Sequence, residues 1–229
     1  VGERPSGSKD PFGLRRAAQG AVKIVASSGW SLDIQEVIAT AVKRVAVFSK
    51  EPAGDLERAV SDFLADRVHR WLTDVAGVGG DTADAVMAVG WSDLPDTMAR
   101  ANALQRVREY DSFRSLALAF KRVRNISESQ PDSEVDEKLF SQPEEHELHR
   151  ATVEFAGALE ELLPARRVAD AFAAMEPLAD ILERYFVEVL VMCDDERVRL
   201  NRIALLKDLG RQFMNLADLS KLQIEGGEQ

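Results

Sequence analysis

A line of cations and one amide between positions 114 and 125 is the part of this sequence best suited to chemistry. At 3.6 residues per turn, Arg114, Lys121 and Asn125 fall on one side of a helix, with Arg122 beside them. Guanidinium and ammonium groups pair with phosphate oxygens, and an amide side chain can read the edge of a base. The spacing is suited to a nucleic-acid-binding stripe, although spacing by itself favours the alternative, an ordinary solvated helix face.

The distribution of charge along the chain favours the same segment. The formal net charge is −10, yet residues 96–127 hold seven basic side chains against three acidic ones. The flanking stretches are acidic, with nine acids against three arginines in 51–95 and eight acids against one lysine in 128–148. A negative total charge argues against binding of polyanions by the whole surface, whereas a basic segment between acidic ones directs a nucleic acid to one face.

Motifs for other kinds of chemistry are weak. His146 and His149 have the spacing of two metal ligands on a helix, but no third ligand is close in sequence. The glycine-rich stretch 77–80 lacks the lysine and hydroxyl residue of a phosphate-binding loop and follows a helix, which is typical of a helix stop. No nucleophile elbow and no Walker motif are present. We therefore expect no catalytic residue, no metal ion and no cofactor in this chain.

The composition is that of a soluble globular protein, with 45% hydrophobic and 30% charged residues. Cys193 is the single cysteine, and in an apolar run it is typical of a buried small hydrophobe in a reducing compartment. No apolar run approaches the roughly 18 residues of a membrane helix, and the polar first residues are unlike a signal peptide. The sequence begins at Val1, which suggests a fragment or a processed product.

Helical periodicity extends along the chain, and no stretch alternates as a strand would. Turn residues such as Gly29, Pro52, Pro164 and Pro177 separate the periodic segments. The expected helices are 10–28 beginning at Asp10 and Pro11, 32–48 with Ser31 as its cap, 55–75, 81–89, 96–127 with a break at Tyr110, 143–163, 165–174, 177–192, and a long last helix. We therefore predict an all-α protein, a helical bundle of nine or ten antiparallel helices.

The last long helix is expected to begin at Asp194 and Asp195, because an aspartate carboxylate accepts hydrogen bonds from the free backbone N–H groups in the first turn of a helix. Its apolar face recurs at three- and four-residue steps as far as Leu216, and Asn201 falls on the opposite, polar side. Arg202 lies inside the apolar stripe by helical phase. A buried guanidinium needs a partner, so we predict a structural Arg202 that is buried and paired with a carboxylate.

Six stretches of this sequence carry a resemblance to a known family. They are GSKDPFGLRRAAQGAVKI (7–24), FLADRVHRWL (63–72), DAVMAVG (84–90), LALAFKRVRNI (116–126), FVEVLVMCDDERVRLNRIALLKDL (186–209) and ADLSKLQ (217–223). In this order they resemble the C-terminal part of the β subunit of bacterial-type glycyl-tRNA synthetase, the enzyme built from separate or fused α and β parts. The later stretches are also similar to the DALR-type anticodon-binding domain.

The resemblance implies a division of the chain and a role for its cations. Residues 1–95 would be the end of an HD-like helical domain and a linker, and residues 96–229 a DALR-like anticodon-binding bundle. The α subunit would charge tRNA(Gly) with glycine, using ATP and magnesium, while this non-catalytic region binds the anticodon stem-loop. The residues expected to contact tRNA are Arg114, Lys121, Arg122, Asn125, then Arg124, and more weakly Arg199. Asn125 could read a base edge, and the cations would position phosphates.

The alternative is a helical scaffold that contacts the α subunit or other β domains without touching RNA. It predicts an exposed apolar patch, which we place within residues 1–95, and no salt-dependent RNA binding. Neither hypothesis involves DNA or a membrane. The resemblance implies a bacterial cytoplasmic location, or a plant organelle if the source is a fused α–β enzyme.

Overall fold

The structure is a computed structural model that describes residues 10, 12–127, 130–131 and 133–224. Within these residues it contains ten α-helices, several short 3-10 turns and one π-helical turn, and no strand. This confirms the predicted all-α class. The chain divides into two compact units, Val1–Ala101 and Asn102–Gln229.

Unit 1 is organised around one long helix, α3. Its elements are α1 (Leu14–Ser28), α2 (Ile34–Val45), α3 (Ala53–Arg70), a π-helical turn (Trp71–Val75), α4 (Gly80–Met87) and the first part of α5 (Leu94–Val107). Helix α3 packs against α1, α2 and α4. The buried side chains Val22, Ile38, Val68 and Leu72 supply the apolar contacts. The two breaks expected at Gly29 and after Val75 are confirmed, and Gly29 adopts the left-handed conformation that ends α1.

The predicted helix starts in unit 1 are wrong by one to four residues, and the first two also concern the capping residue. Helix α1 begins at Leu14 with Gly13 in the N-cap position, and the carboxylate of Asp10 accepts from the backbone N–H groups of Leu14 at 2.8 Å and Arg15 at 3.1 Å in its first turn. Pro11, expected at the first helical position, lies outside the described residues. The cap of α2 is Asp33 and not Ser31, whose hydroxyl donates to Asp93 at 2.8 Å.

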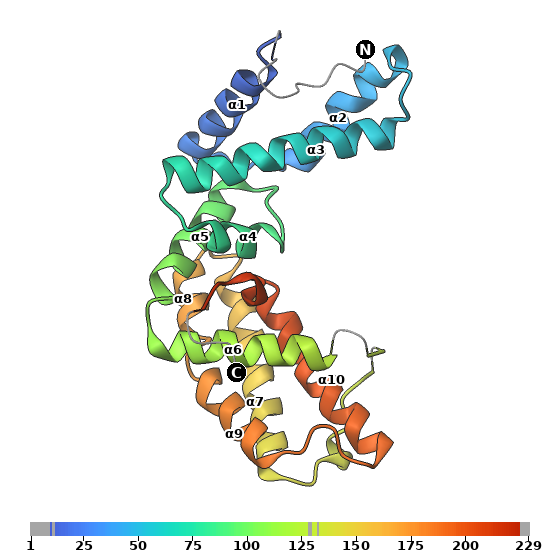
Figure 1. Ribbon diagram of the computed structural model, residues 1–229, viewed down its shortest axis with the longest axis vertical. Helices are drawn as coiled ribbons and strands as arrows, with labels where there is room; N and C mark the ends of the chain where they lie inside the picture. The colour runs from blue at the N-terminus through green and yellow to red at the C-terminus, as the bar shows by residue number, and fades with distance from the viewer. Residues whose placement is uncertain (1–9, 11, 128–129, 132, 225–229) are drawn as a thin grey trace. The chain divides into compact units, whose positions relative to one another are not determined.

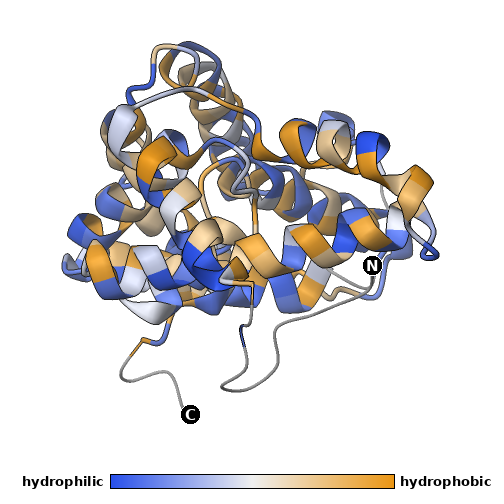
Figure 2. Cartoon of the chain, turned by 90° about the horizontal axis from the view of Figure 1, so that it is seen from above, coloured by the Kyte–Doolittle hydropathy of each residue, from blue (hydrophilic) through white to orange (hydrophobic). Residues whose placement is uncertain are grey.

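Unit 2 is a helical bundle. It contains the end of α5, then α6 (Asp111–Ser127), α7 (Pro143–Leu162), α8 (Val168–Ala173), α9 (Leu178–Glu188) and α10 (Glu196–Phe213). Helix α6 packs against α9 and α10, and α7 packs against the same two helices, so four helices surround one core (Figure 1). Orange and blue residues alternate around the helices in Figure 2, as expected for amphipathic helices that turn one side to their neighbours.

Three phenylalanines from three helices meet in the core of unit 2. The rings of Phe120 on α6 and Phe213 on α10 have centroids 5.4 Å apart, and Phe155 on α7 meets Phe213 at 5.8 Å. All three side chains are buried. Aromatic pairs in such tilted arrangements contribute about 0.5–1.5 kcal/mol beyond the area they bury. The helix that carries the candidate cations is therefore fixed by its own opposite face.

The last helix begins where predicted and ends earlier. Asp195 caps α10 by accepting from the backbone N–H groups of Arg197 and Val198. After Phe213 the chain turns and forms a short 3-10 helix, η4 (Leu219–Lys221), which packs against α6. The expectation that Asn201 lies on the polar side is wrong, because it is buried, and its amide donates to the backbone carbonyl of Asp136 at 3.0 Å.

Candidate nucleic-acid interface

Helix α6 presents the cations that the sequence singled out. Its buried residues are Phe113, Leu116, Ala117, Phe120, Val123 and Ser127, which recur at helical steps. This face packs into the bundle and leaves Arg114 and Asn125 exposed and Lys121 half-buried on the other side. The predicted common side of these three residues is consistent with this burial pattern.

The C-terminal segment of the chain, residues 214–224, holds two of the α6 cations. The Nζ of Lys121 donates to the carbonyl oxygen of Leu222 at 2.7 Å. The Nη1 of Arg124 lies 3.6 Å from Oδ2 of Asp218, whose carboxylate is buried. Lys121 and Arg124 therefore tie this segment to α6 as well as contributing charge to the surface.

Arg122 lies on another side of the same helix. Its guanidinium carbon is 4.2 Å from the centre of the Phe186 ring on α9, a cation–π arrangement. Arg122 thus contacts α9, whereas Lys121 contacts the C-terminal segment. Arg114, one turn into α6, is 3.9 Å from Asp111 in an exposed pair.

The structure gives Arg199 contacts in the loop that precedes α10. Its Nη1 donates to the carbonyl oxygens of Cys193 at 2.7 Å and Asp194 at 3.3 Å. Arg199 is half-buried, and so is Cys193, which was expected to be buried. Arg199 therefore fastens this loop, and its contact with a phosphate remains a prediction.

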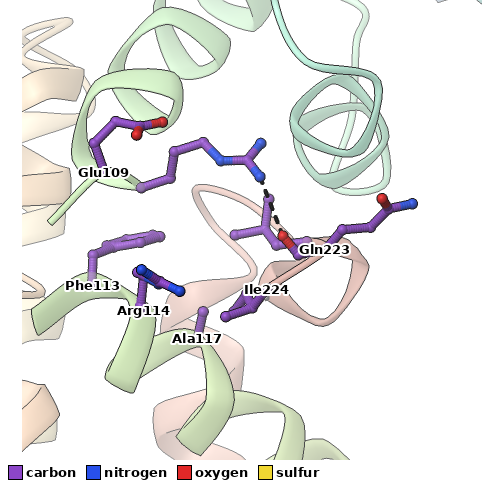
Figure 3. Close-up of a pocket in the computed structure, with 8 residues that line it drawn as sticks. Glu109, Phe113, Arg114, Ala117, Gln223 and Ile224 are labelled. Atoms are coloured by element: carbon purple, nitrogen blue, oxygen red, sulfur yellow. Dashed lines mark hydrogen bonds between the residues drawn. The ribbon is translucent and has the colours of Figure 1, made fainter. Parts of the chain in front are cut away.

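A groove of about 320 Å³ opens beside the first half of α6 (Figure 3). One wall comes from the α5–α6 turn and α6, and the other from the end of the C-terminal segment. The lining residues are Arg108, Glu109, Phe113, Arg114, Ala117, Leu222, Gln223 and Ile224. The Nη2 of Arg108 donates across the groove to the carbonyl oxygen of Gln223 at 3.4 Å. Two guanidinium groups and one carboxylate thus line a groove whose walls are separated by more than 100 residues of sequence.

Sequence reasoning did not single out Arg108 or the groove. Arg108 was counted only as one charge of the basic segment, because helical phase cannot reveal a wall made by residues 222–224. Another member of that segment, Arg100, is buried in unit 1. Its guanidinium donates to the carbonyl oxygens of Val86 at 2.8 Å and Gly90 at 2.6 Å, and it pairs with Asp96 at 2.7 Å. Arg100 is therefore counted in the charge of the basic segment but does not add to its exposed surface.

The prediction for Arg202 is confirmed in its geometry. Its side chain is buried, and its Nε lies 3.0 Å from Oε1 of the buried Glu145. Burial alone would raise the pKa of Glu145, but hydrogen bonds from Arg202 and from the backbone of Ser141 and Gln142 lower it below its ordinary value. The hydroxyl of Tyr185, buried beside the pair, has no hydrogen-bond partner among the described residues. Burial raises the pKa of this phenol.

The two histidines of α7 pack against one aromatic ring. The ring of Phe140 meets His146 at a centroid distance of 5.0 Å and His149 at 5.7 Å, both edge-on. His149 also lies 3.6 Å from Glu137. Across the described part of the chain, no group of three ligating side chains could hold a metal ion.

Two sequence models of protein families match this chain. Residues 1–88 match the family described as glycyl-tRNA synthetase beta subunit, and residues 116–224 match the DALR anticodon binding domain. Among curated proteins, the glycine–tRNA ligase beta subunits of Geobacter sp. (strain M21) and Acidobacterium capsulatum are each 36% identical to it over 97% of its length. The chain spans 32% of the length of each of these relatives. None of the described helices combines the length and apolar composition of a membrane span.

Proposed function

Because this chain is related over 97% of its length to glycine–tRNA ligase β subunits, we propose that it is the tRNA-binding, anticodon-recognising region of such a subunit. The observation that carries the proposal is the match of residues 116–224 to the DALR anticodon-binding domain. That span contains Lys121, Arg122, Arg124 and Asn125 on α6. Unpaired anticodon bases can be splayed onto such a surface, and its cations neutralise the phosphates.

The proposed role is recognition and not chemistry. The α subunit would activate glycine with ATP and magnesium and transfer it to tRNA(Gly). This chain would bind the anticodon stem-loop of the same tRNA, and we propose that it binds no cofactor. The relatives with this name are bacterial, and we propose a cytoplasmic location for the assembled ligase.

A titration with two RNA hairpins tests the proposal. The chain should bind the anticodon stem-loop of tRNA(Gly) more tightly than a stem-loop of altered anticodon, and the affinity should fall with salt. Lys121→Glu combined with Arg122→Glu should weaken binding about tenfold or more, because two charge-assisted contacts become repulsive. The matched control is Lys138→Glu combined with Arg150→Glu. It replaces two exposed cations outside α6 and changes the net charge as much as the α6 double variant does.

Circular dichroism of both double variants shows whether helicity is retained. Equal binding of the two hairpins by the wild-type chain would contradict anticodon recognition. Equal loss of affinity in the two double variants would show that net charge, and not the α6 site, governs binding.

A second role, protein contact by unit 1, is favoured by one observation. Two apolar side chains on α2 are exposed, Val37 at 44% and Val45 at 50%. They line a shallow groove together with Leu32 and Ala41, and Val47 and Phe48 beyond the helix are each 78% exposed. Contiguous exposed apolar surface is typical of an interaction site. We propose that this groove contacts the α subunit or another part of the β subunit.

Charged substitutions in the α2 groove test this second role. Val37→Glu with Val45→Glu should reduce co-purification with the glycine–tRNA ligase α subunit and the remainder of the β subunit. RNA binding by unit 2 should persist, because the changed residues lie in unit 1. Glu36→Gln, also in the groove, keeps its apolar side chains intact and serves as the control.

A further inference from the structure

Tyr110 is an aromatic residue that the core does not use. Its relative exposure is 62%, whereas the other phenylalanine and tyrosine side chains in the described part of unit 2 are buried or half-buried. An exposed ring is the kind of surface on which an unpaired base stacks, since every base has a π face. The sequence pattern treated Tyr110 only as a helix break.

The backbone holds Tyr110 firmly. Its N–H donates to the carbonyl oxygen of Val107 at 3.0 Å, at the end of α5. Its own carbonyl oxygen accepts from the N–H groups of Phe113 and Arg114, both at 3.1 Å, in the first turn of α6. A ring presented from a fixed turn loses little conformational entropy when it binds a ligand.

The same turn leads directly into the groove. Arg108 and Glu109, the two residues before Tyr110, line it, and Arg114 lines it from α6 (Figure 3). The two guanidinium groups and one carboxylate leave the lining with one net positive charge. Guanidinium groups recognise phosphate oxygens with paired N–H donors. An aromatic platform and a cationic groove therefore occur within one short stretch of chain.

We propose that this turn and groove hold one unpaired nucleotide of the RNA, with the base stacked on Tyr110 and the phosphate between Arg108 and Arg114. The inference rests on the proposed function and places base contact at the start of α6, before Lys121 and Asn125. Lys121 and Arg124 also hold the C-terminal segment, which forms the second wall of the groove through Leu222–Ile224. Binding of the nucleotide thus depends on residues from both ends of unit 2.

A stem-loop carrying 2-aminopurine at one loop position at a time tests the stacking. With the wild-type 229-residue chain, one position should change its fluorescence on binding. Tyr110→Ala should abolish that change and weaken binding about 5- to 150-fold, the range measured for loss of one stacked base. Tyr110→Phe keeps the ring and should bind within about twofold of wild type.

The groove is tested by salt dependence. Arg108→Gln and Arg114→Gln should each lower the slope of log affinity against log salt by about 0.7, the value for one contact to a single-strand phosphate. Arg150→Gln, an exposed cation on α7, should leave the slope unchanged. Urea unfolding of each variant shows whether the fold is retained.

The outcomes separate the two proposals. If the wild-type chain binds the stem-loop and Tyr110→Ala binds it equally well, the nucleotide site is wrong and the anticodon function stands. If the wild-type chain does not bind the stem-loop at all, the anticodon function fails, and the nucleotide site fails with it.

Discussion

The Nε of Arg202 donates to Oε1 of Glu145 at 3.0 Å across 57 residues of sequence. The second carboxylate oxygen accepts from the N–H groups of Ser141 at 2.9 Å and Gln142 at 3.0 Å, which caps α7. The Nη1 of Arg202 donates in turn to the carbonyl oxygen of Leu190 at 2.9 Å. One buried ion pair therefore joins the start of α7, the middle of α10 and the loop before α10.

Removal of Arg202 should strongly destabilise the bundle. Arg202→Met leaves a buried carboxylate without its cation, and breaking such a pair costs about 3–5 kcal/mol. Urea unfolding followed by circular dichroism measures the loss. Arg211→Met on the same helix removes an exposed arginine that pairs with Asp208, and should cost no more than about 1 kcal/mol. Equal losses in the two variants would contradict a stabilising role for the buried pair.

Stability should fall in acid because of Glu145. Its pKa is lower in the folded chain than the ordinary value of 4.5, so the folded state binds its proton less readily than the unfolded state. The resulting stabilisation is present above that value and is lost as the pH falls below it. The free energy of unfolding, measured by urea titration from pH 7 to pH 3, should therefore decline less steeply for Glu145→Gln than for wild type. Glu160→Gln, at an exposed position of α7, should keep the wild-type decline.

Helical phase was enough to predict the buried Arg202, since a guanidinium inside an apolar stripe has to find a partner. The same reasoning failed at Asn201, because the segment around Asp136 covers the side of α10 that the pattern leaves polar. The charge count of residues 96–127 also includes Arg100, which is buried and donates to the carbonyl oxygens of Val86 and Gly90. Periodicity records which side chains are polar, but it does not reveal which irregular segment packs over them.

The same limit applies to the candidate interface. Local spacing is enough to predict that the α6 cations share one side of the helix. The groove, in contrast, forms because residues 222–224 lie beside the α5–α6 turn. That arrangement depends on long-range contacts such as the hydrogen bond from Lys121 to Leu222. No local pattern in residues 214–224 predicts which helix they pack against.

Arg100 should matter for stability and not for RNA binding. Arg100→Met leaves two carbonyl oxygens without their donor, and each unsatisfied buried group costs about 1–3 kcal/mol. The urea midpoint of the chain should fall accordingly. The salt slope of RNA binding should match that of the wild type, because a buried cation does not contact phosphates. A reduced slope would show that Arg100 belongs to the interface after all.

The contact between Arg122 and Phe186 predicts a measurable coupling between α6 and α9. The cation lies 4.2 Å from the ring centre, and such a contact at an exposed site contributes about 0.5–1 kcal/mol. Urea unfolding of Arg122→Gln, Phe186→Leu and the double variant gives the coupling free energy. The three variants also separate the two roles of Arg122, because Phe186→Leu removes the ring but leaves the charge. If Arg122 binds phosphate, Arg122→Gln should lower the salt slope of RNA binding, whereas Phe186→Leu should not.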